Sequence, residues 1–150
     1  MQSLKALTRW AVKQSWDVPP VKANVFNGIL MEQLFIKPPF QIERVTLGAN
    51  YLIPSHCHPN VDSWEFALAG RGLAQIGHRE FIIDAGRQNR PVFIPRGLWH
   101  GGQLYEAGGV WLSIQQWSVN IKSLMENWIT RDTARAPFSS KLDASQYAAL

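Results

Sequence analysis

Residues 48–58 read Gly-Ala-Asn-Tyr-Leu-Ile-Pro-Ser-His-Cys-His, and this stretch decides how the rest of the chain is interpreted. On an extended strand, successive side chains alternate between the two faces of the sheet. His56 and His58 are therefore expected to point the same way, with their imidazole rings close enough to share one ion.

A third histidine, His100, ends the segment Pro95-Arg-Gly-Leu-Trp-His100, in which proline and glycine predict a tight turn just before it. Glu65 follows the histidine pair on the next predicted strand and supplies a carboxylate. Three imidazoles and one carboxylate form a mixed nitrogen and oxygen site, which suits iron(II), manganese, zinc, nickel or copper.

These two segments resemble the two sequence motifs of the cupin family. Pro95-x-Gly97-x-x-His100 matches the second motif, and six residues separate Glu65 from Gly72, as in the first motif. The resemblance covers the middle of the chain, from about residue 40 to about residue 118.

The spacing inside the first motif departs from the family pattern. Seven residues separate Gly48 from His56, where five are usual, and six separate His58 from Glu65, where three or four are usual. Asp62 is a rival fourth ligand, but strand alternation places it on the opposite face from Glu65 unless a bulge intervenes. Glu65 is therefore the favoured carboxylate.

The resemblance implies an all-β fold, the cupin double-stranded β-helix or jelly-roll barrel. It also implies a divalent transition metal (iron, manganese, zinc or nickel) and a dioxygenase, isomerase or lyase reaction on a small molecule, with Glu65 as the catalytic residue. The alternative is a non-enzymatic structural or binding subunit of a larger assembly, in which the metal stabilises the barrel or is absent. The metal ligands that the resemblance implies are His56, His58, Glu65 and His100.

Outside the motifs, short apolar runs alternate with glycine, proline and asparagine turns, a pattern typical of an all-β sandwich or barrel. Asn27-Gly28 between two apolar runs predicts a hairpin. Gly70-Arg-Gly72 predicts a turn between strands at 64–68 and 73–76, and Gly108-Gly109 predicts the start of a last long strand at 110–118. Either face of that last strand could line the interior of a barrel that spans about residues 21–118.

Two helices are expected outside the barrel. Residues 3–16 have apolar residues at helical spacing, and Pro19 and Pro20 follow, which cannot continue a helix. A C-terminal helix and tail are expected over about residues 119–150. The apolar residues of this second helix recur at the i, i+3, i+4, i+7 and i+8 positions of an amphipathic stripe, and they are Ile121, Leu124, Met125, Trp128 and Ile129.

Length and composition limit the classes of function. The 150 residues fit one domain, so residues 1–150 are expected to form a single cupin domain. The net charge of +4 is spread without a dense basic block, which argues against nucleic-acid binding, and no apolar run approaches the ~20 residues of a membrane span. Cys57 is the only cysteine, which fits a reducing, cytoplasmic location. A small-molecule ligand and a homo-oligomer or assembly subunit are expected.

Overall fold

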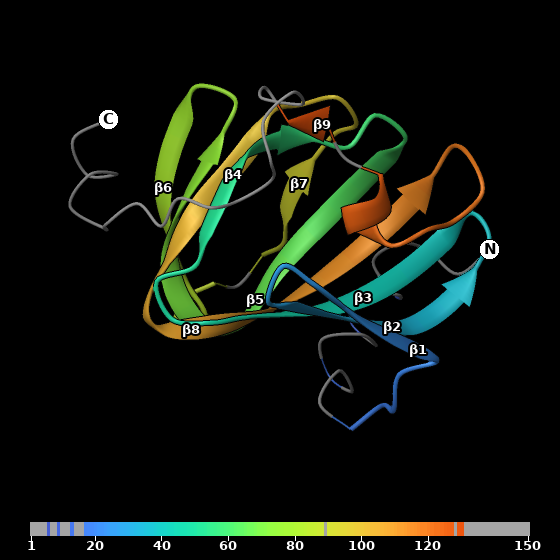
Figure 1. The fold of residues 1–150 in the computed structure, drawn as a ribbon, viewed down its shortest axis with the longest axis horizontal. Coiled ribbons are helices and arrows are strands. Elements are labelled where there is room, and N and C mark those ends of the chain that lie inside the picture. Colours follow the sequence, from blue (N-terminus) through green and yellow to red (C-terminus); the bar gives the residue numbers. More distant parts are fainter. Residues whose placement is uncertain are drawn as a thin grey trace.

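The computed structural model describes residues 17–88, 90–127 and 129–130, together with Ala6, Arg9 and Lys13. Within these residues nearly all regular structure is β-strand, which confirms the predicted all-β fold (Figure 1). The strands are β1 (Lys22–Phe26), β2 (Ile29–Lys37), β3 (Phe40–Leu47), β4 (Leu52–Cys57), β5 (Val61–Ile76), β6 (Arg79–Asp84), β7 (Val92–Ile94), β8 (His100–Trp117) and β9 (Ile129–Thr130).

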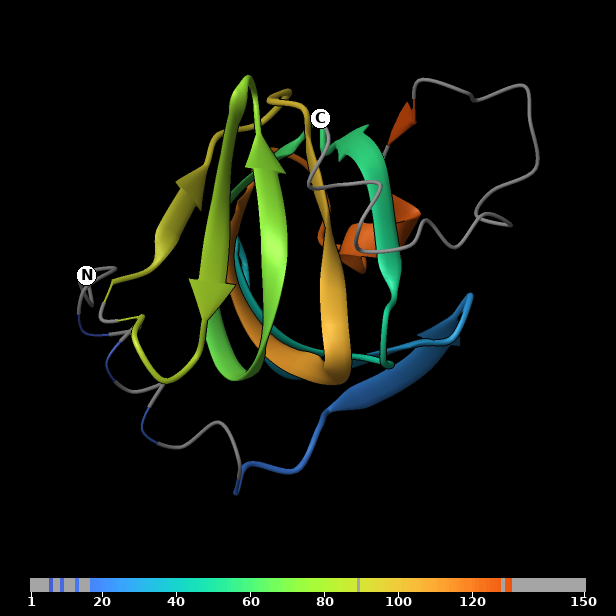
Figure 2. The same ribbon diagram turned by 90° about the vertical axis from the view of Figure 1, so that its left-hand side faces the viewer.

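The two longest strands, β5 and β8, are antiparallel neighbours over most of their length and organise the molecule. The first half of β5 and the second half of β8 continue one sheet, in the order β1-β2-β3-β8-β5-β7. Their other halves continue a facing sheet, in the order β6-β5-β8-β4-β9, most of which Figure 2 shows nearly face on. The two strands therefore belong to both layers, which enclose the interior of the barrel.

Both long strands bend at one level, where glycines lie opposite one another. Gly70 of β5 pairs with Gly109 of β8, and the φ angles of Gly70 and Gly108 are 88° and 65°. A Cβ atom on Gly70 would overlap the carbonyl oxygen of Gly108. Only glycine accommodates both the positive φ and this close approach of two backbones.

This bend corrects two of the predicted boundaries. The predicted turn at Gly70-Arg-Gly72 does not separate two strands, because β5 passes through it as one strand. In the same way β8 begins at His100 and passes through Gly108-Gly109, where a strand start was predicted. Because the two strands bend together, their pairing continues on both sides of the bend. The register shifts there, with one residue of β5 and four residues of β8 between the pairs Gly70–Gly109 and Gly72–Leu104.

The first hairpin forms where the sequence predicts it. Asn27 and Gly28, with φ angles of 49° and 81°, connect β1 to β2, and Phe26 pairs with Ile29 across the turn. Positive φ at both central residues is the geometry of the two-residue turn that suits the twist of paired strands.

Strand alternation divides the buried side chains into two groups. One apolar cluster lies between the two sheets and includes Ile29, Met31, Leu47 and Leu104. The other lies on the outer face of β2, β3 and β8, and its fully or nearly fully buried members are Leu34, Ile42, Leu112 and Ile114. On β8, Trp111, Ser113, Gln115 and Trp117 consequently face the interior.

The predicted C-terminal helix is wrong in the part that the structure describes. Residues Leu124–Glu126 form a single turn of 3-10 helix, and Ile129–Thr130 form β9, which pairs with β4 at His56 and Cys57. Leu124 packs into the interior cluster, and its backbone N–H donates to Glu43. These contacts with the barrel override the local helical pattern.

Ala6, Arg9 and Lys13 have helical backbone geometry, and the rest of the helix predicted over residues 3–16 lies outside the described residues, as do residues 131–150 of the tail. No helix in the described part of the chain is long and apolar enough to cross a membrane.

Replacing Gly70 with alanine is expected to lower the free energy of unfolding by about 2–5 kcal/mol, because the added Cβ strains a positive φ and clashes with β8. Gly48→Ala is the matched control, since nothing lies within 4 Å of a Cβ there. Urea unfolding of both variants measures the difference. Equal stability of the two variants would contradict the bend as a packing constraint.

Candidate metal centre and pocket

Three histidines meet inside the barrel on two neighbouring strands. His56 lies on β4, His58 follows the last residue of β4, and His100 begins β8 opposite His56. The ring centroids of His56 and His100 are 4.2 Å apart, and those of His58 lie 4.9 Å and 5.2 Å from these two. One potential ligand atom of each residue lies within 4.8 Å of those of the other two. The structure thus brings together the three histidines that the sequence singles out.

Backbone carbonyl groups fix the orientation and the tautomer of each ring. The Nδ1 to oxygen distances are 2.7 Å (His56 to Pro54), 2.7 Å (His58 to Asn127) and 2.8 Å (His100 to Leu98). Because a carbonyl oxygen only accepts hydrogen bonds, each Nδ1 carries the proton and donates it. Each Nε2 is then the unprotonated nitrogen, the form in which imidazole binds a metal.

The environment keeps all three rings neutral. Burial lowers the pKa of His56 well below its ordinary value, and the neighbouring imidazoles lower it further. Burial also lowers the pKa of His58 to about 3 and that of His100 below its usual range. Neutral rings can bind a cation near pH 7 without first losing protons.

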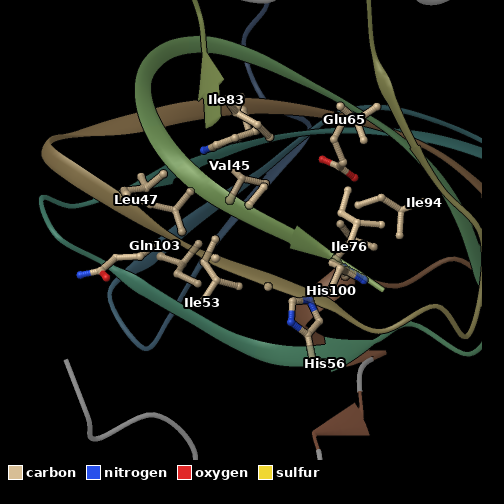
Figure 3. A pocket seen from close by; sticks show the side chains of 18 of the residues that line it. Val45, Leu47, Ile53, His56, Glu65, Ile76, Ile83, Ile94, His100 and Gln103 are labelled. Carbon is tan, nitrogen blue, oxygen red and sulfur yellow. The ribbon is translucent and has the colours of Figure 1, made fainter. Parts of the chain in front are cut away.

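Glu65 lines the same pocket from β5, with its carboxylate pointing inward (Figure 3). Its Oε1 accepts a hydrogen bond of 2.7 Å from the hydroxyl of Ser113. Burial raises the pKa of Glu65 to about 7, although hydrogen bonds from Ser113 and Ser63 act in the opposite direction. Among the described residues, the group of converging ligand atoms consists of the three histidines and does not include Glu65, which lines the same pocket as a carboxyl group with a pKa near neutral pH.

Asp62, the rival carboxylate, lies outside the pocket. Its side chain accepts hydrogen bonds from the backbone N–H and the guanidinium group of Arg96, and this pairing lowers its pKa. Strand alternation in β5 accounts for the difference, because Asp62 and Glu65 point to opposite faces.

A chain of interior hydrogen bonds, which the sequence pattern does not predict, extends from Glu65 across the barrel. All of its members lie on β2, β3, β5 or β8 and point inward. The bonds run from Ser113 to Glu65 (2.7 Å), from Gln115 to Ser113 (3.2 Å) and to Glu43 (2.9 Å), from Gln41 to Gln115 (2.9 Å), and from Gln33 to Gln41 (2.7 Å).

Glu43 is the second carboxyl group inside the barrel and is fully buried. Its Oε2 accepts from Gln115 and from the backbone N–H of Leu124 at 3.2 Å. Burial raises its pKa, and no cation lies among the groups that shift it. Among the described residues, the polar half of the interior therefore carries no positive charge that would compensate either carboxyl group, which favours their protonated forms.

The rest of the pocket wall is apolar. The cavity has a volume of about 140 Å³ and is lined, beyond the histidines and Glu65, mainly by aliphatic side chains of both sheets. Ile53, Ile76, Ile83 and Ile94 line the same cavity as His56, His100 and Glu65 (Figure 3).

The donor set fits a divalent transition metal. Three neutral imidazoles whose Nδ1 protons are held by carbonyl groups are the ligands that such ions take in proteins, and the pocket beside them leaves room for further ligands. The three histidines could therefore hold a metal ion.

Comparisons with known proteins agree with the fold. No family model and no curated protein matches the sequence. Among solved structures, KdgF from Halomonas sp. superposes with a TM-score of 0.57 at 13% identity, over 66% of this chain and 88% of KdgF. An RmlC-like cupin from Shewanella frigidimarina gives a TM-score of 0.56 at 12% identity, over 65% of this chain and 84% of the other.

A structure of the DMSP lyases RdDddP and RnDddQII is also similar, with a TM-score of 0.57 and 13% identity over 69% of this chain and 53% of the other. Superpositions at such low sequence identity show that the strands are arranged in the same way. They do not show that the proteins share an activity. The strand order, the pair of bent long strands and these superpositions together show that this chain has the cupin fold, as its two motifs predict.

Proposed function

We propose that this chain is a metal-dependent enzyme that acts on a small molecule inside its barrel. The observation that carries the proposal is the convergence of three neutral, carbonyl-oriented histidines beside a pocket that also contains a carboxyl group with a pKa of about 7. His56, His58 and His100 are the proposed metal ligands. Glu65 is the proposed acid and base, or a fourth ligand.

A bound divalent ion would supply Lewis acidity, polarising an oxygen atom of the substrate. Glu65 would move a proton to or from the substrate, since an efficient acid or base has a pKa near the working pH. Ser113 holds the Glu65 carboxyl group in position through its 2.7 Å hydrogen bond. Within the classes that the motifs imply, this pairing favours an isomerase or lyase reaction, in which a proton is transferred, over a dioxygenase reaction.

Replacing His58 with alanine is expected to abolish metal binding, because the ion would lose one of its three imidazole ligands. The wild type is expected to hold roughly one ion per chain. His78→Ala is the matched control, since His78 is exposed on the turn between β5 and β6. Elemental analysis after purification and reconstitution measures both. Metal retained equally by the two variants would sink the proposed site.

The Glu65→Gln change is expected to flatten the pH dependence of stability in the metal-free protein. The folded-state pKa of about 7 lies above the ordinary value of 4.5. The stability contributed by the protonated carboxyl group is therefore fully present below pH 4.5 and is lost as the pH rises through 7. Between pH 5 and pH 8 this titration is expected to lower the free energy of unfolding of the wild type by about 2–3 kcal/mol. The glutamine variant does not titrate and is not expected to show this loss. Urea unfolding of both proteins at the two pH values tests it. Parallel pH profiles would show that Glu65 is ionised in the folded state throughout.

The second candidate is a non-enzymatic subunit of an assembly, in which the ion stabilises the barrel. The outermost strand favours it: Val25 on β1 and Val21 just before it are each 69% exposed. Stability of His58→Ala separates the two proposals. A catalytic ion predicts that the metal-free wild type and the His58→Ala variant both remain folded and unfold cooperatively. A structural ion predicts that both lose the folded state when metal is absent.

A further inference from the structure

We propose that the molecule bound in this pocket is small and predominantly apolar, about the size of a single ring, with one oxygen-donor group directed at the three histidines. The inference rests on the proposed function, since it assumes that an ion is held there, and it deepens that function by naming the class of ligand.

The wall of the pocket sets the chemistry of the ligand body. On one sheet the wall consists of Ile29, Met31 and Leu47, and on the facing sheet of Ala74, Ile76 and Ile83. Apart from the histidines, Glu65 and Gln103, the side chains that line it are aliphatic or belong to Trp111. A hydroxyl group placed against such a wall loses its hydrogen bonds to water without replacement, which disfavours sugars and other polyols.

Charge excludes a second class of ligand. No lysine or arginine lies among the described residues that line the pocket. The nearby arginines are engaged elsewhere, because Arg96 pairs with Asp62, and Arg71 and Arg87 both approach Asp84. A phosphate or carboxylate group placed in the pocket away from the ion would therefore be buried without a counter-charge, so a single oxygen-donor group directed at the ion is favoured.

Size limits the ligand further. The cavity volume of about 140 Å³ is close to the ~150 Å³ of an engineered apolar cavity that binds benzene. One ring or a short branched chain fills this volume.

Two hydroxamic acids test the proposal because they share one metal-binding group and differ in their apolar part. Protein loaded with cobalt(II) is titrated with acetohydroxamic acid and with benzohydroxamic acid, and the visible absorption of the cobalt reports binding. Burial of the phenyl ring is expected to make benzohydroxamic acid bind at least about tenfold more tightly. Glycine hydroxamic acid, which carries an ammonium group, is expected to bind more weakly than acetohydroxamic acid.

A pair of variants controls for differences in the intrinsic affinity of the two compounds for the metal. Ala74 lines the pocket, whereas Gln75, next to it on β5, does not line it and points to the other face. Ala74→Leu is expected to reduce the preference for the phenyl compound to about twofold or less, while acetohydroxamic acid still binds, and Gln75→Leu is expected to keep the full preference.

The outcomes separate the two proposals. Failure of the wild type to bind cobalt would overturn the proposed function itself. Cobalt binding with equal affinity for the two hydroxamic acids, or a preference unchanged in Ala74→Leu, would leave the metal site intact and overturn the apolar ligand. Tighter binding of glycine hydroxamic acid than of acetohydroxamic acid would overturn it as well.

Discussion

The close contact between β5 and β8 at Gly70 and Gly108 is the constraint on which the rest of the structure depends. Two long strands can belong to both layers only if they bend together, and they can bend together only if their backbones approach without side chains between them. One side of the bend presents Glu65 and Ser113 to the interior, and the other side presents His100. The bend therefore places Glu65 and His100 in the wall of the same pocket, although they lie on different parts of the same strand pair.

The interior of the barrel is divided between two chemical environments, and Glu65 lies at their boundary. Behind it, amide and carboxyl groups of β2, β3 and β8 hydrogen-bond to one another. In front of it, aliphatic side chains line the pocket. The polar group of residues supplies neutral hydrogen-bond partners and no positive charge, so it orients the carboxyl group without forcing it to ionise. A site of this kind can keep a proton available where water is scarce.

The sequence predicts the histidines better than it predicts their surroundings. The period-two spacing of His56 and His58, and the turn before His100, are local signals, and they place the three rings together. The polar network is different, because Gln41, Glu43 and Gln115 alternate with apolar residues that face outward and are nonetheless fully buried. Alternation alone cannot tell which face is the interior when both are covered. The predicted C-terminal helix fails for a related reason, since Leu124 is held by the barrel and by Glu43.

The orientation of one histidine depends on a distant part of the chain. The carbonyl oxygen that accepts the hydrogen bond from Nδ1 of His58 belongs to Asn127. This residue lies 69 positions later in the chain, shortly before β9, the strand that pairs with β4. An ion held by His58 would favour the conformations in which this segment is docked, and docking of the segment would raise the affinity for the ion by the same factor. Release of such an ion and release of this edge of the barrel would then be thermodynamically coupled.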